Sequence, residues 1–233
     1  MRANVAQIFP RYSARHEGEL LSPYADVRNL VTVSIGVLID PIALAIDLPW
    51  MIGDRPATHA EIRDDWQALK SRPELRTWVA KKQAPLTSIR LTQDASDALV
   101  RHRLQLNVDY VRKFLHNWDE APADSQLATA SLCWAVGAGL NKTRPSFVEA
   151  FNAGDWFTCR QHSHIDETNN PGVIGRNRDQ ELCWSNATVV TARRLDPSWL
   201  WWPNRTPPDA DLHTLALKAI ELGIARTTKP PES

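Results

Sequence analysis

Two carboxylates and a hydroxyl lie close together near the N-terminus and are the residues of this sequence best suited to chemistry. Glu17 is followed by Asp26 nine positions later and by Thr32 six positions after that. Two carboxylates in different environments can deliver a proton to a leaving oxygen and stabilise an oxocarbenium-like centre, as glycosidic cleavage requires. The simpler interpretation is that Glu17 sits on a solvated helix end and that Asp26 opens a turn. The elements around these residues decide between the two interpretations.

A helix is predicted to end at the first acid. Residues 5–21 carry apolar side chains roughly at helical spacing, among them Val5, Ile8 and Tyr12. Gly18 suits a C-terminal cap, because glycine readily adopts the left-handed conformation that ends many helices. This places Glu17, partly buried, at the helix end. Pro10 is expected near the start of the helix or at a break in it.

A β-hairpin is predicted to carry the other two groups. Asp26 and Thr32 are expected to project from one face of the sheet by lying opposite one another, which requires a turn with an odd number of residues. Residues 28–30 supply such a turn, and Asn29 tolerates the positive φ that the turn needs. In this register Ser34 shares the polar face, which is expected to line a cleft. The other, apolar face is expected to carry Val27, Val31, Val33 and Ile35.

The remainder of the chain is predicted to be mainly helical. Residues 41–90 give the weakest signal and are expected to be only partly helical. Downstream, apolar periodicity predicts a series of amphipathic helices and one central helix, from Pro122, that is apolar nearly all round. The predicted helix starts are Thr58 (with a capping box to Glu61), Pro73, Thr92 (with an end near Trp118), Pro122, Pro145, Arg176 and Asp209.

The sequence has ten tryptophans, and indole rings both fill helical cores and stack on sugar rings. Trp50 and Trp66 follow the hairpin and are the candidates for stacking on a sugar. Together with Tyr24 and Ser34 they complete the expected substrate-binding set. A C-terminal cluster is expected instead to pin the end of the chain to the core, and it consists of Trp199, Trp201 and Trp202.

Charge and composition exclude several classes of partner. The chain has 27 basic and 27 acidic residues, so it lacks the positive field that attracts nucleic acid. No window reaches the length of a membrane span, and the N-terminus lacks the apolar core of a signal peptide. Cys133, Cys159 and Cys183 lack the paired spacing of a zinc site, so buried thiols and at most one disulfide are expected. No metal and no cofactor is expected, and the H-x-H pair at residues 162–164 is interpreted as part of a polar loop.

The order and spacing of these motifs resemble the phage-type lysozymes, glycoside hydrolase family 24. That family has an E-G dipeptide at a helix end, an aspartate nine residues on, and a threonine six further in a T-x-G-x-G hairpin strand. The matching residues are His16-Glu17-Gly18, Asp26 and Thr32-Val33-Ser34-Ile35-Gly36. Further similar segments start at Leu91, Val136, Ser146 and Arg178. The likeness covers residues 11–187 and is interrupted over residues 40–90.

The resemblance implies an α+β, mainly helical, lysozyme-like fold with a small β-hairpin lobe and a larger helical lobe. The whole chain, 1–233, is then a single lysozyme-like domain. Its parts are an N-terminal helix and catalytic hairpin (1–40), a partly helical insertion (41–90), a helical lobe (91–187) and a C-terminal extension (188–233). In this interpretation Glu17 is the general acid, while Asp26 and the Thr32 hydroxyl hold a water on the opposite sugar face, which is the inverting arrangement.

Four residues depart from the family pattern. Asn29 stands where the family has the hairpin glycine, and Ser34 replaces the first glycine after the threonine. Ala135 replaces the asparagine of an F-N-x-G segment, and Asn177 interrupts a pair of arginines. These changes bear on the rate and the substrate fit more than on the fold.

The expected function is that of a muramidase, which cleaves the β-1,4 bond between N-acetylmuramic acid and N-acetylglucosamine. Two alternatives stay open: a lytic transglycosylase that uses Glu17 alone, and a non-catalytic peptidoglycan-binding module of a phage tail. The expected partner is the peptidoglycan glycan strand, with a cognate immunity protein if the chain is a secreted effector. A monomer without stable membrane insertion is expected. It would be made in the cytoplasm without a signal peptide and reach the periplasmic wall by holin release, a phage tail or a secretion machine.

Overall fold

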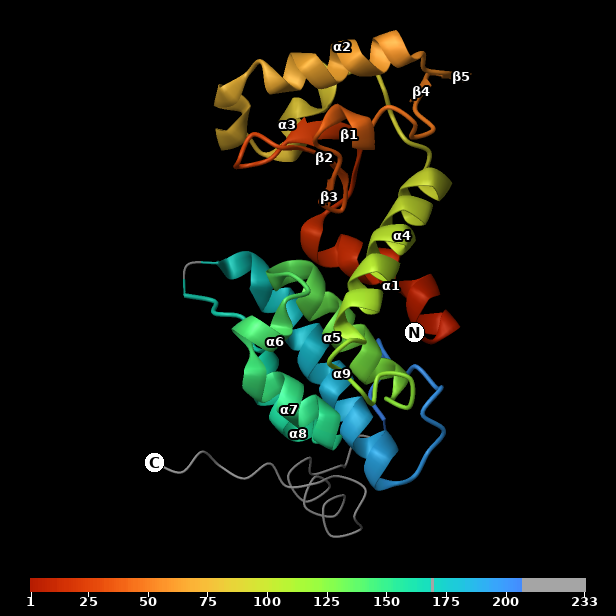
Figure 1. The fold of residues 1–233 in the computed structure, drawn as a ribbon, viewed down its shortest axis with the longest axis vertical. Helices are drawn as coiled ribbons and strands as arrows, with labels where there is room; N and C mark the ends of the chain where they lie inside the picture. Colours follow the sequence, from red (N-terminus) through yellow and green to blue (C-terminus); the bar gives the residue numbers. More distant parts are fainter. Residues whose placement is uncertain (169, 207–233) are drawn as a thin grey trace. The chain divides into compact units, whose positions relative to one another are not determined.

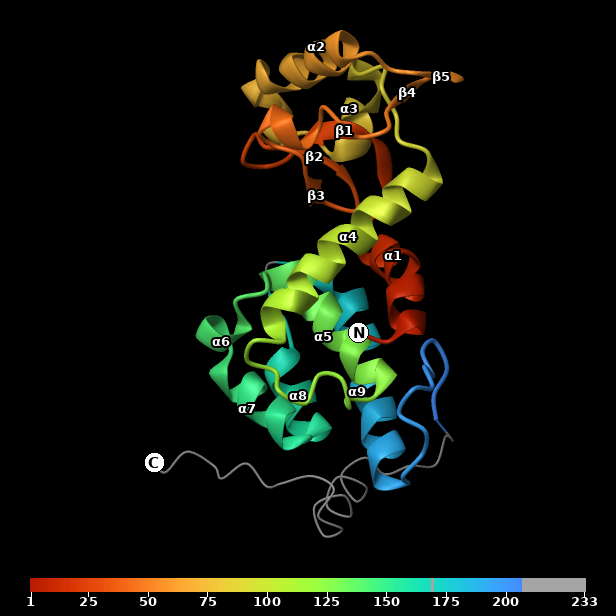
Figure 2. The same cartoon turned by 45° about the vertical axis from the view of Figure 1, so that its right-hand side comes forward.

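The computed structural model describes residues 1–168 and 170–206, and its elements are labelled in Figures 1 and 2. The described residues form two compact units: one is Pro10–Arg103, and the other combines Met1–Phe9 with the described residues from Leu104 to Thr206. Helices predominate, and the strands form one three-stranded and one two-stranded antiparallel sheet. This confirms the expected α+β, mainly helical class. The helix predicted to start at Asp209 lies outside the described residues.

Helix α1 (Ala3–Glu17) ends at the first acid, as the sequence predicts. Gly18 has a φ of 69° and its N–H donates to Ala14 O at 3.1 Å, so the helix stops in a left-handed residue that glycine adopts without strain. The expectation for Pro10 is wrong, because this proline lies inside the helix. Its neighbour Phe9 is fully buried, and tertiary packing of this kind overrides the local penalty for proline.

The hairpin consists of β1 (Leu20–Ala25) and β2 (Val31–Ser34), and β3 (Val37–Leu38) pairs with the other edge of β2. Tyr24 pairs with Thr32, and Asp26 N–H donates to Leu30 O at 2.9 Å. The turn therefore has the expected odd number of residues but comprises residues 27–29, one position earlier than predicted.

This shift places Thr32 opposite Tyr24 and not opposite Asp26. Side chains of paired residues share a face of the sheet, and so do alternate residues along a strand. Asp26 therefore still lies on the same face as Thr32, through Tyr24, as predicted. Val27 was expected on the apolar face and is 79% exposed, because it belongs to the turn. Val31, Val33 and Ile35 are buried as expected.

The segment at residues 41–90 folds into short elements that pack on the hairpin. Thr58 and Glu61 form the predicted capping box at the start of α2, with the Thr58 side chain accepting from Glu61 N at 3.3 Å and the Glu61 side chain accepting from Thr58 N at 2.8 Å. The helix predicted from Pro73 is instead divided into short pieces. The elements are η1 (Ile42–Leu44), β4 (Met51–Ile52), β5 (Arg55–Pro56), α2 (His59–Lys70), η2 (Pro73–Thr77), α3 (Ala80–Gln83) and η3 (Ala84–Leu86).

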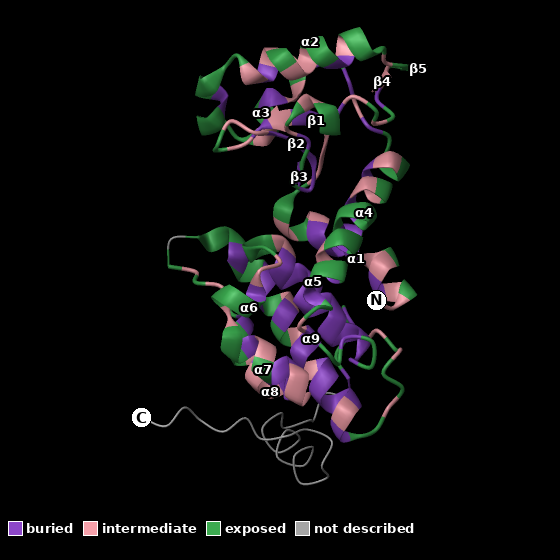
Figure 3. Ribbon diagram, in the orientation of Figure 1, coloured by how far each residue is buried: buried purple, intermediate pink, exposed green. Residues whose placement is uncertain are grey.

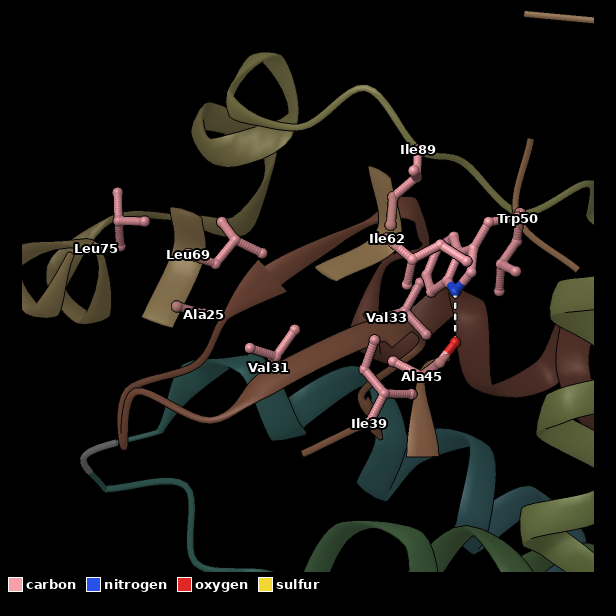
Figure 4. Packing of buried hydrophobic residues seen from close by; sticks show 11 residues of the cluster. Ala25, Val31, Val33, Ile39, Ala45, Trp50, Ile62, Leu69, Leu75 and Ile89 are labelled. Carbon is pink, nitrogen blue, oxygen red and sulfur yellow. Dashed lines mark hydrogen bonds between the residues drawn. The ribbon is translucent and has the colours of Figure 1, made fainter. Parts of the chain in front are cut away.

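The hairpin and this segment share one hydrophobic core, shown in Figure 4. Val31 and Val33 of β2 meet Ile62 and Leu69 of α2, and Trp50 lies in the same cluster. Each such buried aliphatic side chain contributes about 1.5–3 kcal/mol relative to exposure. Residues 41–90 are thus part of the hairpin unit and not an appended module.

The second unit is built around α5 (Ala123–Val136), which packs against α9 (Ile174–Ala192). Residues 123–133 of α5 are all buried, as the pattern predicts for a central helix (Figure 3). Helix α4 (Gln93–Val111) runs from the hairpin unit into this one and ends earlier than predicted. The remaining elements are α6 (Leu140–Thr143), α7 (Pro145–Ala153), α8 (Trp156–Ser163) and η4 (Pro171–Val173).

A buried carboxylate fixes the segment that follows α9. Asp124 is fully buried and accepts hydrogen bonds from the backbone N–H groups of Trp201 (2.9 Å) and Trp202 (3.1 Å) and from Asn186 Nδ2 (2.9 Å). Trp202 is buried, which agrees with the expected anchoring, whereas Trp199 is exposed.

The three cysteines are buried and free, which fits the expectation of buried thiols. Burial raises the pKa of the Cys133 thiol to about 12. Burial also raises the pKa of the Cys159 and Cys183 thiols, so all three stay protonated at neutral pH. Within the described residues, no helix combines the length and the apolar character needed to cross a membrane.

Candidate active site

A hollow of about 240 Å³ lies in the hairpin unit at the end of α1. Three segments form it: the residues around the helix end, the hairpin strands, and the start of α3. The described residues that line it are Glu17, Gly18, Glu19, Leu20, Tyr24, Ser34, Val79, Ala80 and Lys81. The hollow thus contains three of the seven residues that the sequence analysis selects, namely Glu17, Tyr24 and Ser34.

Glu17 is exposed, so the predicted partial burial is wrong. The last turn of α1 also carries the basic residues Arg15 and His16. The positive φ of Gly18 turns the chain sharply after Glu17 and starts β1 two residues later. The acid therefore stands at the rim of the hollow, where a ligand can reach it.

Tyr24 connects the two predicted acids electrostatically. Its pKa is raised to about 12, mainly because the phenol is partly withdrawn from water and further because the carboxylates of Glu17 and Asp26 act on it. The charges of both acids therefore act on one phenolic hydroxyl, although the acids are nine residues apart in the sequence. A phenol with this pKa stays protonated at neutral pH and offers an O–H donor beside the two carboxylates.

The raised pKa of Tyr24 predicts a loss of stability in alkali. Between pH 10 and pH 12 the folded state keeps a proton that the unfolded state releases, so the stabilisation is complete below pH 10 and is lost as the pH approaches 12. We expect the free energy of unfolding to fall by at most about 2–3 kcal/mol more in the wild type than in Tyr24→Phe. Urea titrations across this pH range measure it, with Tyr110→Phe, on the exposed side of α4, as the control. An equal fall in wild type and Tyr24→Phe would contradict the assignment.

Asp26 has a structural role as well as its place near Tyr24. Its Oδ1 accepts hydrogen bonds from Arg28 N and Leu30 N, each at 2.8 Å, so the carboxylate caps the hairpin turn. Its Oδ2 lies 3.8 Å from Arg28 Nε. The turn-forming interpretation of this residue is therefore confirmed, and the chemical one stays a prediction.

Thr32 is 5% exposed, and its Oγ1 donates to Leu30 O at 3.2 Å. The described lining of the hollow includes neither Thr32 nor Asp26. The expected polar face that lines a cleft is thus only partly present, because both polar groups turn toward the backbone of their own hairpin.

The two positions where this chain lacks a hairpin glycine both have left-handed backbone. Asn29 has a φ of 59°, as predicted, and Ser34 a φ of 58°. This conformation costs a non-glycine residue on the order of 1 kcal/mol. Ser34 is buried and its Oγ lies 2.6 Å from Ser96 Oγ. Ser96 in turn donates to Glu19 Oε1 at 2.7 Å.

The direction of this hydrogen-bonded chain follows from its end. The Ser96 hydroxyl has one hydrogen and donates it to Glu19 Oε1, so Ser96 Oγ accepts the hydrogen bond that Ser34 Oγ donates. Glu19 also accepts from Gln93 Nε2, at 3.0 and 3.1 Å. The carboxylate of Glu19 is thereby held in place in the wall of the hollow.

Glu19 and Lys81 also line the hollow and are not among the residues predicted from the sequence. Glu19 was visible as a second acid two residues after Glu17, on the far side of Gly18. Lys81 gave no local signal, because α3 reaches the hollow only through the fold of the insertion.

Neither aromatic side chain chosen for sugar stacking lines the hollow. Trp50 is 1% exposed in the core, and its Nε1 donates to Ala45 O at 2.8 Å (Figure 4), so its selection as a substrate-binding residue is wrong. Trp66 packs against the same core, its Nε1 donates to Ile39 O at 3.3 Å, and the Lys70 ammonium lies 5.6 Å from its ring centre. Both indoles pack in or against the hydrophobic core, because α2 and the loop before it cover the apolar face of the hairpin.

The histidine pair does not lie in a loop as predicted, because His162 belongs to α8 and His164 follows its end. Among residues 1–168 and 170–206 there is no group of three or more histidine, cysteine or acidic side chains that could hold a metal ion. Comparison of the chain with protein-family models, with curated proteins and with solved structures finds no match.

Proposed function

We propose that this chain is a peptidoglycan-degrading glycoside hydrolase, a muramidase that cleaves the β-1,4 bond between N-acetylmuramic acid and N-acetylglucosamine. One observation carries the proposal: Glu17 and Tyr24 line the same hollow, and the carboxylates of Glu17 and Asp26 both raise the pKa of Tyr24. Two carboxylates near one site are the minimum equipment for acid-assisted glycoside hydrolysis. The resemblance of the motif spacing to family 24 lysozymes supports the same assignment.

In the proposed mechanism Glu17 protonates the glycosidic oxygen of the leaving sugar. Asp26, which two backbone N–H donors hold in place, supplies the negative charge that stabilises the developing oxocarbenium centre. Inversion requires Asp26 and the Thr32 hydroxyl, which bond to the backbone of their own hairpin in this structure, to hold the attacking water on the other face of the sugar. Tyr24, protonated, donates a hydrogen bond to the bound sugar.

One observation favours the lytic transglycosylase as the second candidate. Asp26 Oδ1 is engaged by the turn and Thr32 Oγ1 donates to its own strand, which leaves Glu17 as the acid best exposed to a ligand. An enzyme that uses one acid forms a 1,6-anhydro product by internal attack and needs no held water. The two candidates therefore differ in the product and not in the bond that is cut.

Mass analysis of the fragments released from purified peptidoglycan tests the proposal. We expect soluble muropeptides with reducing muramic ends, each heavier by one water than the corresponding anhydro fragment. Fragments with anhydro ends would show that the protein is a lytic transglycosylase and not a hydrolase. Binding to sacculi without any release of fragments would instead support a non-catalytic module, and heat-inactivated protein serves as the blank.

A further inference from the structure

Gln83 fastens α3 to the strand that leads to Asp26. This side chain is fully buried, and its Oε1 accepts from Ala25 N at 2.8 Å while its Nε2 donates to Ala25 O at 3.0 Å. The amide therefore pairs with Ala25 as a neighbouring strand would. Nε2 also contacts Leu75 O at 3.0 Å. These bonds connect residues 58 positions apart and fix α3 beside the hairpin.

The start of α3 forms one wall of the hollow. Val79, Ala80 and Lys81 line it, and Gln83 lies two residues further along the same helix. Lys81 is the only basic side chain among the described lining residues, and it faces a lining that includes the acids Glu17 and Glu19. The fold of the insertion thus brings one cation to an otherwise acidic hollow.

The lysines of this unit differ in how they are used. Lys70 Nζ donates to Asp40 Oδ2 and to Asn29 O, each at 2.7 Å, and so has a structural role. Lys81 is exposed and forms no hydrogen bond or ion pair with another described residue. An ammonium group held by a clamped helix, with no acidic partner, is available to a ligand.

The charge of a ligand determines whether it would gain from binding Lys81. A neutral glycan needs no cation, whereas a ligand that carries carboxylates is repelled by Glu17, Glu19 and Asp26 unless a positive group offsets them. The peptide substituents of peptidoglycan carry such carboxylates on each muramoyl residue. We propose that Lys81 binds a carboxylate of the peptide attached to the muramoyl unit in the hollow, an inference that rests on the proposed function.

Amidation of the peptide carboxylates of purified sacculi provides the test. On untreated sacculi, Lys81→Gln is expected to weaken binding in a co-sedimentation assay by about two- to fivefold, the range of a single exposed ion pair. The same loss should appear in KM, with kcat unchanged. On amidated sacculi the wild type should bind as weakly as the variant. The variant should bind amidated and untreated sacculi equally.

Lys82→Gln is the matched control, because Lys82 is exposed on the same short helix and does not line the hollow. Equal binding by the two lysine variants, or equal sensitivity of wild type and Lys81→Gln to amidation, would overturn the inference. So would a failure of the wild type to bind untreated sacculi. Selective loss of binding in Lys81→Gln without any cleavage by the wild type would uphold the carboxylate site and reject the hydrolase.

Discussion

Replacement of Glu17 by glutamine is expected to slow the release of muropeptides by about 10²–10⁴-fold, the range attributed to a general acid. Glutamine preserves the size of the side chain and cannot deliver a proton to the glycosidic oxygen. Glu17 is exposed at the end of α1, where substitutions have small effects on stability, so the variant should melt at nearly the wild-type temperature. The effect should appear in kcat, with KM little changed.

Glu74→Gln controls for the loss of one acid from the same unit. Glu74 is exposed on η2 and does not line the hollow, so its replacement should leave the rate unchanged. Rates are measured on sacculi at several enzyme concentrations, so that small residual activities are quantified. Wild-type activity in Glu17→Gln would remove the acid from the mechanism and with it both enzymatic candidates. A large loss in Glu74→Gln would point to a general effect of charge.

The parts of this site that the sequence predicts are those fixed by local rules. The end of α1 follows from Gly18, which reaches the left-handed region without strain. The positive φ of Asn29 follows from the tolerance of asparagine for the left-handed region, and the odd turn follows from placing Asp26 and Thr32 on one face. The capping box at Thr58 is likewise contained within four residues. Such features need no knowledge of the distant chain.

The parts that the sequence does not predict depend on contacts between distant residues. The sequence predicts that Trp50 stacks on a sugar. It is buried instead, because residues 41–90 share one hydrophobic core with the hairpin. Lys81 reaches the hollow because Gln83 pairs with Ala25, 58 residues away. The exact turn position is a subtler case, since Asp26 Oδ1 selects it by binding Arg28 N and Leu30 N. Because the turn lies one residue earlier than predicted, Thr32 pairs with Tyr24 and not with Asp26.

The double role of Asp26 makes a pair of substitutions more informative than either alone. Asparagine keeps an Oδ1 acceptor for Arg28 N and Leu30 N, whereas alanine removes the cap and the charge together. We expect Asp26→Asn to keep its stability within about 0.5 kcal/mol of the wild type and to lose about 10²-fold or more in kcat. Asp26→Ala should lose as much activity and in addition about 1–2 kcal/mol of stability.

Urea titrations and initial rates on sacculi separate the two effects, with Asp64→Asn on the exposed face of α2 as the control for a lost carboxylate. Full activity in Asp26→Asn together with low activity and stability in Asp26→Ala would show that the carboxylate serves the turn alone. Glu17 would then be the single acid, and the fragments should carry anhydro ends. Loss of activity in Asp26→Asn with unchanged stability would instead require the charge itself, because the asparagine leaves the capped turn in place. That result would select the hydrolytic mechanism with Asp26 as the second carboxylate.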